Sequence, residues 1–201
     1  MHHKNFEMAI VSEQISTPDK HNKNNYMLDT VAYNRISENI GCHLPILEMS
    51  LKLGYKYYIT DVQAAELSGI RINEYGDVDD RSKSIIHKSN DFMLIKNKLS
   101  IYRTLQQMSN FPKRARLDGS VFLPVEDANV MDLYKCIYKG NHKQFEDATI
   151  ATSAIVMNCV LVTADKRLFA KVKEVFPNKV LKYNDLIQKI NCELNTIRTQ
   201  P

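Results

Sequence analysis

The chain alternates short apolar runs with longer stretches in which apolar residues recur at helical spacing. A short run of apolar, aromatic or β-branched residues between polar segments predicts a strand. Longer stretches with apolar positions three and four residues apart predict helices. The predicted strands are 26–28, 55–60, 121–123, 160–163 and 179–183, and the predicted helices are 31–40, 44–53, 62–70, 82–108, 126–138, a segment opened by Asp147, 166–175 and 184–197.

The order of these segments predicts the fold class. Strands that alternate with helices favour right-handed crossovers, which make the strands parallel and place helices on both faces of the sheet. The all-apolar run 160–162 is typical of a strand buried on both faces. We therefore expect an α/β fold with a mainly parallel central sheet, residues 1–25 as an N-terminal extension or linker, and residues 26–201 as one domain.

Several local signals refine this prediction. Gly41 and Gly54 follow apolar helical stretches and are predicted to close them, because glycine readily takes the left-handed conformation of a helix end. Asp61 has the position of an N-cap, and the polar segment 71–81 is predicted to be a surface loop rather than a calcium loop. The apolar stripe from Ile85 to Tyr102 is predicted to face the core. His43, His87 and His142 are isolated and are not expected to form a site.

Composition excludes some classes of protein and leaves others open. The chain of 201 residues is 44% hydrophobic and 25% charged, which is ordinary for a globular protein. No run approaches the roughly 18 apolar residues of a membrane span, and the N-terminus lacks the apolar core of a signal peptide, so we expect a cytoplasmic protein without membrane contact. The four cysteines are spread along the chain and are expected to be reduced and mostly buried. A net charge of +4 permits nucleic-acid binding without demonstrating it.

Four acidic residues lie where a parallel sheet would bring them to one edge. Asp29 and Asp165 directly follow predicted strands, and Glu66 and Asp147 lie near the starts of predicted helices. Ligands of open α/β sheets bind at the carboxyl ends of the strands. Each acid taken alone is explained equally well as a helix cap, since an aspartate at a helix start accepts bonds from free amides.

Together the acids predict a metal site. Carboxylates gathered in one place repel each other unless some take up a proton or a cation is bound. Oxygen ligands without histidine or cysteine favour Mg²⁺ or Mn²⁺. Such an ion lowers the pKa of bound water and stabilises the oxygens of a phosphate during displacement.

These residues resemble the PIN-domain family of metal-dependent ribonucleases, especially the virulence-associated protein C-like toxins of toxin–antitoxin pairs. The resemblance rests on four short motifs in order, between residues 26 and 183: MLDT, ITDVQAAEL, EDATIATSA and LVTADKRLF. It implies a three-layer PIN-like domain and an endoribonuclease that uses metal-activated water.

The resemblance also assigns roles to individual residues. Asp29, Asp147 and Asp165 would hold the metal, Glu66 would support it and help to position the attacking water, and Thr30 and Thr163 would support the acids. Family members often carry a further acid two residues after the last aspartate, where this chain has Arg167. A second metal is therefore not expected.

An RNA substrate requires cations beside the acids. Lys166, Arg167 and Lys171 follow Asp165 closely, and a denser basic cluster lies at Lys113, Arg114 and Arg116. A solvated surface explains both groups equally simply. Some of the ten tyrosines are candidate stacking platforms for bases, but the sequence does not separate them from core residues. The family resemblance adds an antitoxin protein and a homodimer as candidate partners.

Three alternatives remain open from the sequence. The chain could be an RNA-processing PIN nuclease without a toxin role, which gene neighbourhood would reveal. It could be a catalytically weak RNA- or protein-binding module, an alternative that Arg167 keeps open. A phosphotransfer receiver domain is disfavoured, because Asp29 stands alone after the first strand where a receiver needs paired acids.

Overall fold

We describe the protein from a computed structural model, which defines residues 24–67, 70–72, 78–80, 86–103, 106–107, 122–123, 128–141 and 144–198. The extension expected at residues 1–25 is described only at its last two positions. The basic cluster of Lys113, Arg114 and Arg116 lies outside the described residues, as do Ile85 and His142.

A five-stranded sheet forms the centre of the molecule, with the strand order β5-β2-β1-β8-β9. Every pairing in it is parallel. The strands are β1 (Asn25–Leu28), β2 (Lys56–Ile59), β5 (Tyr102–Arg103), β8 (Val160–Thr163) and β9 (Val180–Lys182). The predicted α/β class with a parallel sheet is therefore confirmed.

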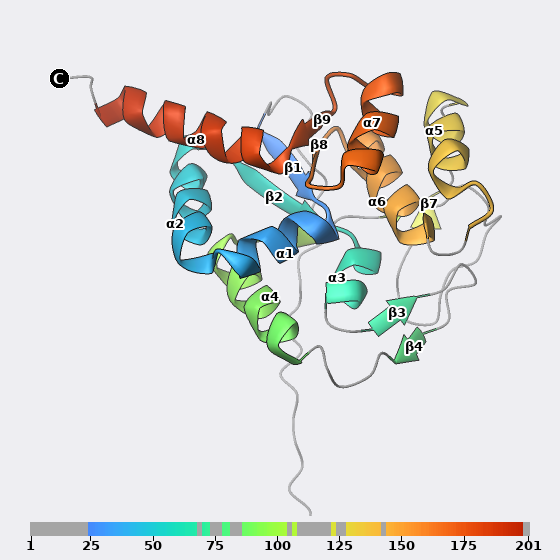
Figure 1. The fold of residues 1–201 in the computed structure, drawn as a ribbon, viewed down its shortest axis with the longest axis horizontal. Coiled ribbons are helices and arrows are strands. Elements are labelled where there is room, and N and C mark those ends of the chain that lie inside the picture. Colours follow the sequence, from blue (N-terminus) through green and yellow to red (C-terminus); the bar gives the residue numbers. More distant parts are fainter. Residues whose placement is uncertain are drawn as a thin grey trace, which may run out of the picture.

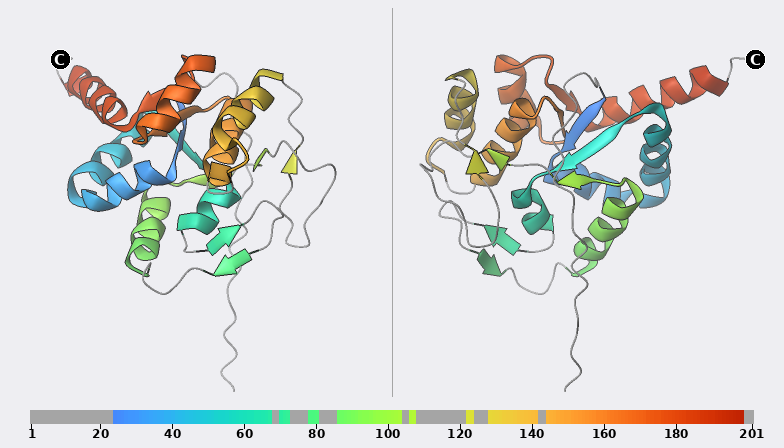
Figure 2. Two further views of the ribbon diagram at one scale, coloured as in Figure 1. Left: turned by 45° about the vertical axis from the view of Figure 1, so that its right-hand side comes forward. Right: turned by 180° about the vertical axis from the view of Figure 1, so that it is seen from behind.

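Helices cover both faces of this sheet, which makes three layers (Figure 1). One layer contains α1 (Thr30–Glu38), α2 (Ile40–Ser50) with the short η1 (Leu51–Leu53), α4 (Ile86–Lys98) and α8 (Tyr183–Arg198). The other contains α5 (Ala128–Tyr138), α6 (Phe145–Val156) and α7 (Lys166–Val175). Helix α3 (Asp61–Leu67) follows β2 and lies between the two layers near the strand ends, as both views of Figure 2 show.

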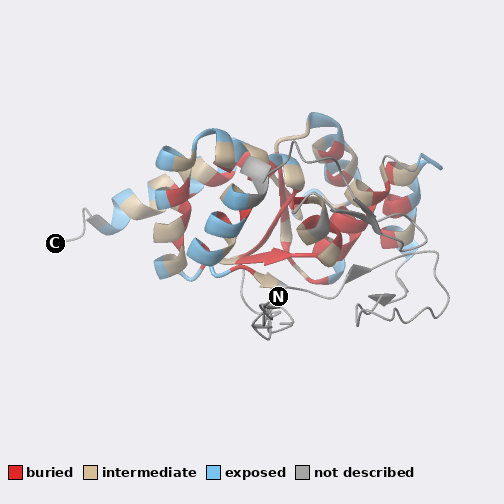
Figure 3. Ribbon diagram, turned by 90° about the horizontal axis from the view of Figure 1, so that it is seen from below, coloured by how far each residue is buried: buried red, intermediate tan, exposed pale blue. Residues whose placement is uncertain are grey.

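Side chains of the sheet alternate between two apolar cores. Tyr26 and Leu28 pack among helices of the first layer, whereas Met27 between them packs among helices of the second. On β8, Val162 packs in the first of these cores and Leu161 packs in the second. Figure 3 shows the strands as a buried band between partly exposed helices. Burial on both faces explains why these runs are apolar throughout.

The segment after α3 differs from its prediction. In place of a surface loop at 71–81, β3 (Ile70–Ile72) and β4 (Val78–Asp80) form an antiparallel ribbon. The predicted helix 62–70 therefore ends earlier, at Leu67.

The long helix predicted at 82–108 is also wrong in its second half. Helix α4 ends at Lys98, and Ser100 takes a positive φ of 47°. This left-handed residue turns the chain out of the helix, so that β5 can pair with β2. A second ribbon follows, in which β6 (Gln106–Gln107) pairs with β7 (Phe122–Leu123). The stripe on α4 is core as predicted, because Phe92, Ile95 and Leu99 are buried.

Of the two glycines predicted to end helices, only one does so. Gly54 has a φ of 80° and closes η1. Gly41 lies inside α2, because α1 already ends at Glu38 and the chain turns at Asn39. Asn39 is the C-cap of α1 in place of Gly41. The sequence does not distinguish a glycine inside a helix from a glycine that ends one.

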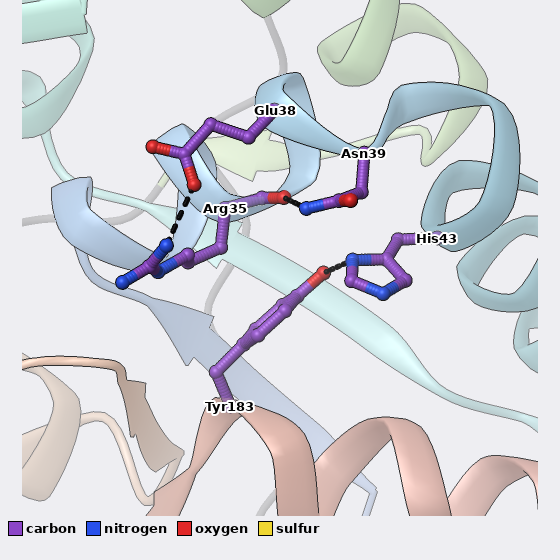
Figure 4. A network of polar contacts seen from close by, with 5 residues as sticks. All are labelled: Arg35, Glu38, Asn39, His43 and Tyr183. Atoms are coloured by element: carbon purple, nitrogen blue, oxygen red, sulfur yellow. Dashed lines mark hydrogen bonds and ion pairs between the residues drawn. The ribbon is translucent and has the colours of Figure 1, made fainter.

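Helices α2 and α8 are joined by a polar contact between Tyr183 and His43 (Figure 4). The Tyr183 hydroxyl and His43 Nδ1 are 3.0 Å apart, and the two rings meet edge to face. Beside them, the Asn39 amide donates to the Arg35 carbonyl at 3.4 Å, and Arg35 pairs with Glu38 at 2.8 Å. His43 is thus a satisfied structural histidine.

All four cysteines are free, but only Cys159 is buried, while Cys136 is half-buried and Cys42 and Cys192 are exposed. The expectation that most are buried is wrong, because both exposed cysteines lie on the outer faces of helices.

Among the described residues, no helix combines the length and the apolar character needed to cross a bilayer.

Candidate functional site

Asp29 is the most enclosed acid at the carboxyl edge of the sheet. It follows β1, and its side chain caps α1 by accepting a hydrogen bond from the Ala32 amide at 2.6 Å. Its second oxygen accepts from the Thr163 hydroxyl at the end of β8. With only 2% of its surface exposed, Asp29 is a carboxylate whose two oxygens are both oriented by the protein.

Asp165 follows the neighbouring strand and caps α7. Its Oδ1 accepts from the amides of Arg167 at 2.6 Å and Leu168 at 3.0 Å. The Asp165 amide donates to the Thr163 hydroxyl oxygen at 2.9 Å. Thr163 therefore donates to Asp29 and accepts from Asp165, so one hydroxyl fixes the two strand ends relative to each other.

Glu66 and Asp147 approach the same edge from helices. The Thr30 hydroxyl donates to Glu66 Oε2 at 2.6 Å, which joins α3 to the first turn of α1. Asp147 is the third residue of α6 rather than its first, because the helix already begins at Phe145. Both carboxylates are partly exposed.

Gln63 contributes to this corner and was not identified from the sequence. Its side chain is fully buried; its amide nitrogen donates to the carbonyl of Leu28, the residue before Asp29. Oε1 of Gln63 accepts from the backbone amide of Thr60 at 3.2 Å, and the backbone amide of Gln63 donates to the Thr60 hydroxyl at 3.2 Å. This reciprocal pair is a capping box, so Thr60 caps α3 and Asp61 is the first residue of the helix rather than its cap. The Thr-x-x-Gln spacing of residues 60–63 is the sequence pattern from which this capping box could have been predicted.

The electrostatic environment links the four acids. Burial, reinforced by the charges of Asp147 and Asp165, raises the pKa of Asp29 to about 7, although its bonds from Thr163 and Ala32 act in the opposite direction. Burial also raises the pKa of Asp147 to about 6, and the charges of Glu66 and Asp165 add to this while Lys171 opposes it. Asp29 thus lies within the electrostatic influence of Asp147 and Asp165, and Asp147 within that of Glu66 and Asp165.

The fit to a metal ion can be judged from the donor set and from its spacing. Hard oxygen donors that repel each other match the preference of Mg²⁺ or Mn²⁺. Across the described part of the chain, however, no three acidic, histidine or cysteine side chains are grouped closely enough to hold a metal ion. The chemistry of the residues fits a divalent cation, and the carboxylates would have to draw together to bind one.

Cations border the acids on α7. Lys166 and Arg167 are exposed in its first turn. Lys171 is half-buried, and its ammonium group lies 3.3 Å from the Ile137 carbonyl and 3.5 Å from Gln144 Oε1. Lys171 is therefore held beside Asp147 by structural contacts, whereas Lys166 and Arg167 face solvent.

The tyrosines considered as stacking platforms belong mainly to the core. Seven of the tyrosines that the structure describes are buried, and several contact one another, as Tyr26 and Tyr55 do with ring centroids 5.1 Å apart. The buried tyrosines are Tyr26, Tyr33, Tyr55, Tyr57, Tyr58, Tyr134 and Tyr183.

A separate hollow lies between α2 and α8. It measures about 300 Å³ and is lined mainly by amide side chains together with His43 and Cys192. No carboxylate lines it, so the acids at the sheet edge are the better candidate for metal-dependent chemistry.

Comparisons with known proteins concern the fold. No family model matches the chain, and no curated protein matches it. Among solved structures, VapBC2 from Rickettsia felis bound to a promoter DNA fragment aligns with a TM-score of 0.44 and 19% identity, over 79% of this chain and 98% of that chain. VapBC-1 from nontypeable Haemophilus influenzae aligns with a TM-score of 0.43 and 16% identity, over 80% of this chain and 98% of that chain. PAE2754 from Pyrobaculum aerophilum aligns with a TM-score of 0.45 and 16% identity, over 84% of this chain and 96% of that chain.

At identities of 16–19% and TM-scores of 0.43–0.45, these three structures are distant relatives in fold. The fold class rests on the strand order described above.

Proposed function

We propose that this protein is a PIN-type endoribonuclease that hydrolyses RNA with the help of one Mg²⁺ or Mn²⁺ ion. The observation that carries the proposal is the burial of Asp29 within the electrostatic reach of Asp147 and Asp165. An uncompensated group of this kind lowers stability, and a bound divalent cation offsets that cost. The sequence resemblance to PIN-domain ribonucleases supports the same activity.

In this proposal Asp29, Asp147 and Asp165 hold the cation, with Glu66 in a supporting position. When bound, the cation supplies a water molecule of lowered pKa and neutralises charge on the phosphate. The hydrogen bonds from Ala32 and Thr163 hold Asp29 in one orientation. Thr30 donates to Oε2 of Glu66, and in this proposal the other oxygen of Glu66 accepts a hydrogen bond from the attacking water.

The arginine at position 167 is an argument for one metal ion rather than two. It stands where related sequences often have another acid, and it is exposed in the first turn of α7. A cation at this position opposes a second divalent ion and favours the phosphate backbone of a nucleic acid.

Cleavage of labelled single-stranded RNA tests the activity. We expect cleavage with Mg²⁺, none with EDTA, and a loss of at least 100-fold in Asp29→Asn, since one ligand and its charge are removed. Asp185→Asn, a change at an exposed acid on α8, is the matched control and should cleave normally. Equal cleavage in all samples would exclude the metal-dependent reaction, and binding without cleavage would favour the alternative of a weak RNA-binding module.

The biological role that we propose is that of a toxin restrained by an antitoxin protein. Its support is the motif resemblance alone. Expression of the chain should arrest growth, Asp29→Asn should relieve the arrest, and co-expression of a small neighbouring gene should do the same. Growth unaffected by the active chain would favour the alternative, an RNA-processing nuclease without a toxin role.

A further inference from the structure

The segment from Lys166 to Lys182 carries an unusual concentration of positive charge beside the acids. It contains one acid, Glu174, and six cations: Lys166, Arg167, Lys171, Lys173, Lys179 and Lys182. Lys171 is held by the Ile137 carbonyl, and Lys179 donates to Asn158. The other four cations are exposed.

Two of these exposed cations gather on one aromatic ring. The ammonium group of Lys182 lies 5.2 Å from the centroid of Phe169, and that of Lys173 lies 5.7 Å from it. Phe169 is half-buried and packs against the core beneath α7. Within the described part of the chain, neither lysine has an acidic partner. Two like charges attracted to one ring repel each other, and an anion placed between them relieves that repulsion.

This cluster lies next to the catalytic candidates. The Phe169 amide donates to the Asp165 carbonyl at 3.0 Å, so Phe169 is one helical turn from that acid. Lys182 is the register partner of Thr163 in the parallel pair of β8 and β9. Thr163 in turn holds Asp29. Phe169 and Lys182 therefore lie near the edge of the sheet that carries Asp29 and Asp165, and Lys173 reaches the ring from the next turn of α7.

We propose that Phe169, Lys173 and Lys182 form a subsite for the nucleotide next to the scissile phosphate of single-stranded RNA. This inference rests on the proposed ribonuclease function and extends it to the mode of substrate binding. The two ammonium groups bind a phosphate, and the ring of Phe169 offers a surface on which an unpaired base stacks. A duplex hides the faces of its bases, so the subsite selects single strands.

Binding of a fluorescent single-stranded RNA of about 12 nucleotides to the full-length protein in EDTA tests this subsite without requiring cleavage. Lys173→Ala and Lys182→Ala should each weaken binding by 3- to 10-fold and lower the salt dependence by about one phosphate contact. Phe169→Leu keeps an apolar side chain against the core and should weaken binding at least 5-fold without changing the salt dependence. Lys182→Arg should restore most of the affinity.

Lys52→Ala is the matched control, because Lys52 is also exposed but lies in η1, before the start of β2. It should bind RNA like the wild type. Unchanged binding in the Lys173 and Lys182 variants overturns the proposal, as does an equal loss in Lys52→Ala or equal affinity for a duplex RNA of the same length. If Phe169→Leu does not fold, the two lysine variants still decide the matter. Failure of metal-dependent cleavage is recorded separately and leaves the binding result intact.

Discussion

The hydroxyl of Thr163 donates a hydrogen bond to Asp29, a residue 134 positions earlier in the chain. The contact joins the ends of β1 and β8, two neighbouring strands of the parallel sheet. Thr163 also accepts from the Asp165 amide at 2.9 Å. A single buried hydroxyl thereby orients two of the acids proposed to bind the metal.

Replacing Thr163 by valine should weaken Mn²⁺ binding by 10- to 100-fold, because groups that orient metal ligands typically contribute that much. The substitution preserves shape but removes a donor from the buried Asp29, so the free energy of unfolding should also fall by about 1–3 kcal/mol. Isothermal titration calorimetry and urea unfolding measure the two effects. Thr163→Ser keeps the hydroxyl and should retain most of the metal affinity; equal loss in both variants would contradict this role.

Stability of the metal-free protein should fall as pH rises from about 4 to 7. The pKa of Asp29 is about 7 in the folded protein and 3.8 as its ordinary value. In this interval the unfolded chain ionises while the folded protein retains its proton, so rising pH favours unfolding. The full difference corresponds to about 4 kcal/mol. In Asp29→Asn the decline between these pH values should be smaller but still present, because Asp147, with a pKa raised to about 6, also titrates in this interval; urea unfolding in EDTA measures the difference.

Millimolar Mg²⁺ should stabilise the protein at pH 7.5. Binding to the folded state alone contributes about 3 kcal/mol when the free ion is about 100 times its Kd. Differential scanning fluorimetry should show a higher melting temperature with MgCl₂ than with NaCl of equal ionic strength. Asp147→Asn should reduce this increase, whereas an identical increase in that variant would exclude Asp147 as a ligand.

Gln63→Leu should lower the free energy of unfolding by about 1–3 kcal/mol, because it leaves the Thr60 amide and the Leu28 carbonyl without their bonds to Gln63. Gln63→Glu keeps the oxygen that accepts from Thr60 but loses the donor to Leu28. If the contact with Leu28 positions Asp29, both variants should cleave RNA more slowly at saturating substrate. Gln188→Leu, at an exposed position on α8, is the control and should change neither property.

Tyr183→Phe should separate structural stability from activity. It removes the 3.0 Å hydrogen bond to His43 between α8 and α2 and should cost about 1 kcal/mol of stability. Cleavage should be unchanged at a temperature where the variant is folded, because Tyr183 packs in the core on the opposite face of the sheet from α7. A loss of activity in the folded variant would show that the α2–α8 contact influences the site.

The repeating strand–helix order could be predicted from the sequence alone, because burial on both faces requires apolar strands such as 160–162 and crossovers require helices between them. The sequence also placed Asp29 and Asp165 at the carboxyl edge of the sheet, since each lies just after the end of a strand.

The groups that contact these acids, in contrast, could not be predicted, because they come from elements far apart in the sequence. Gln63 reaches Leu28, Thr163 reaches Asp29, and Lys182 lies beside Thr163 through pairings between segments distant in the sequence. Local patterns carry no information about register or side-chain reach across a sheet. For the same reason, the end of α4 at Lys98 depends on the pairing of β5 with β2, which overrides the helical pattern of the segment.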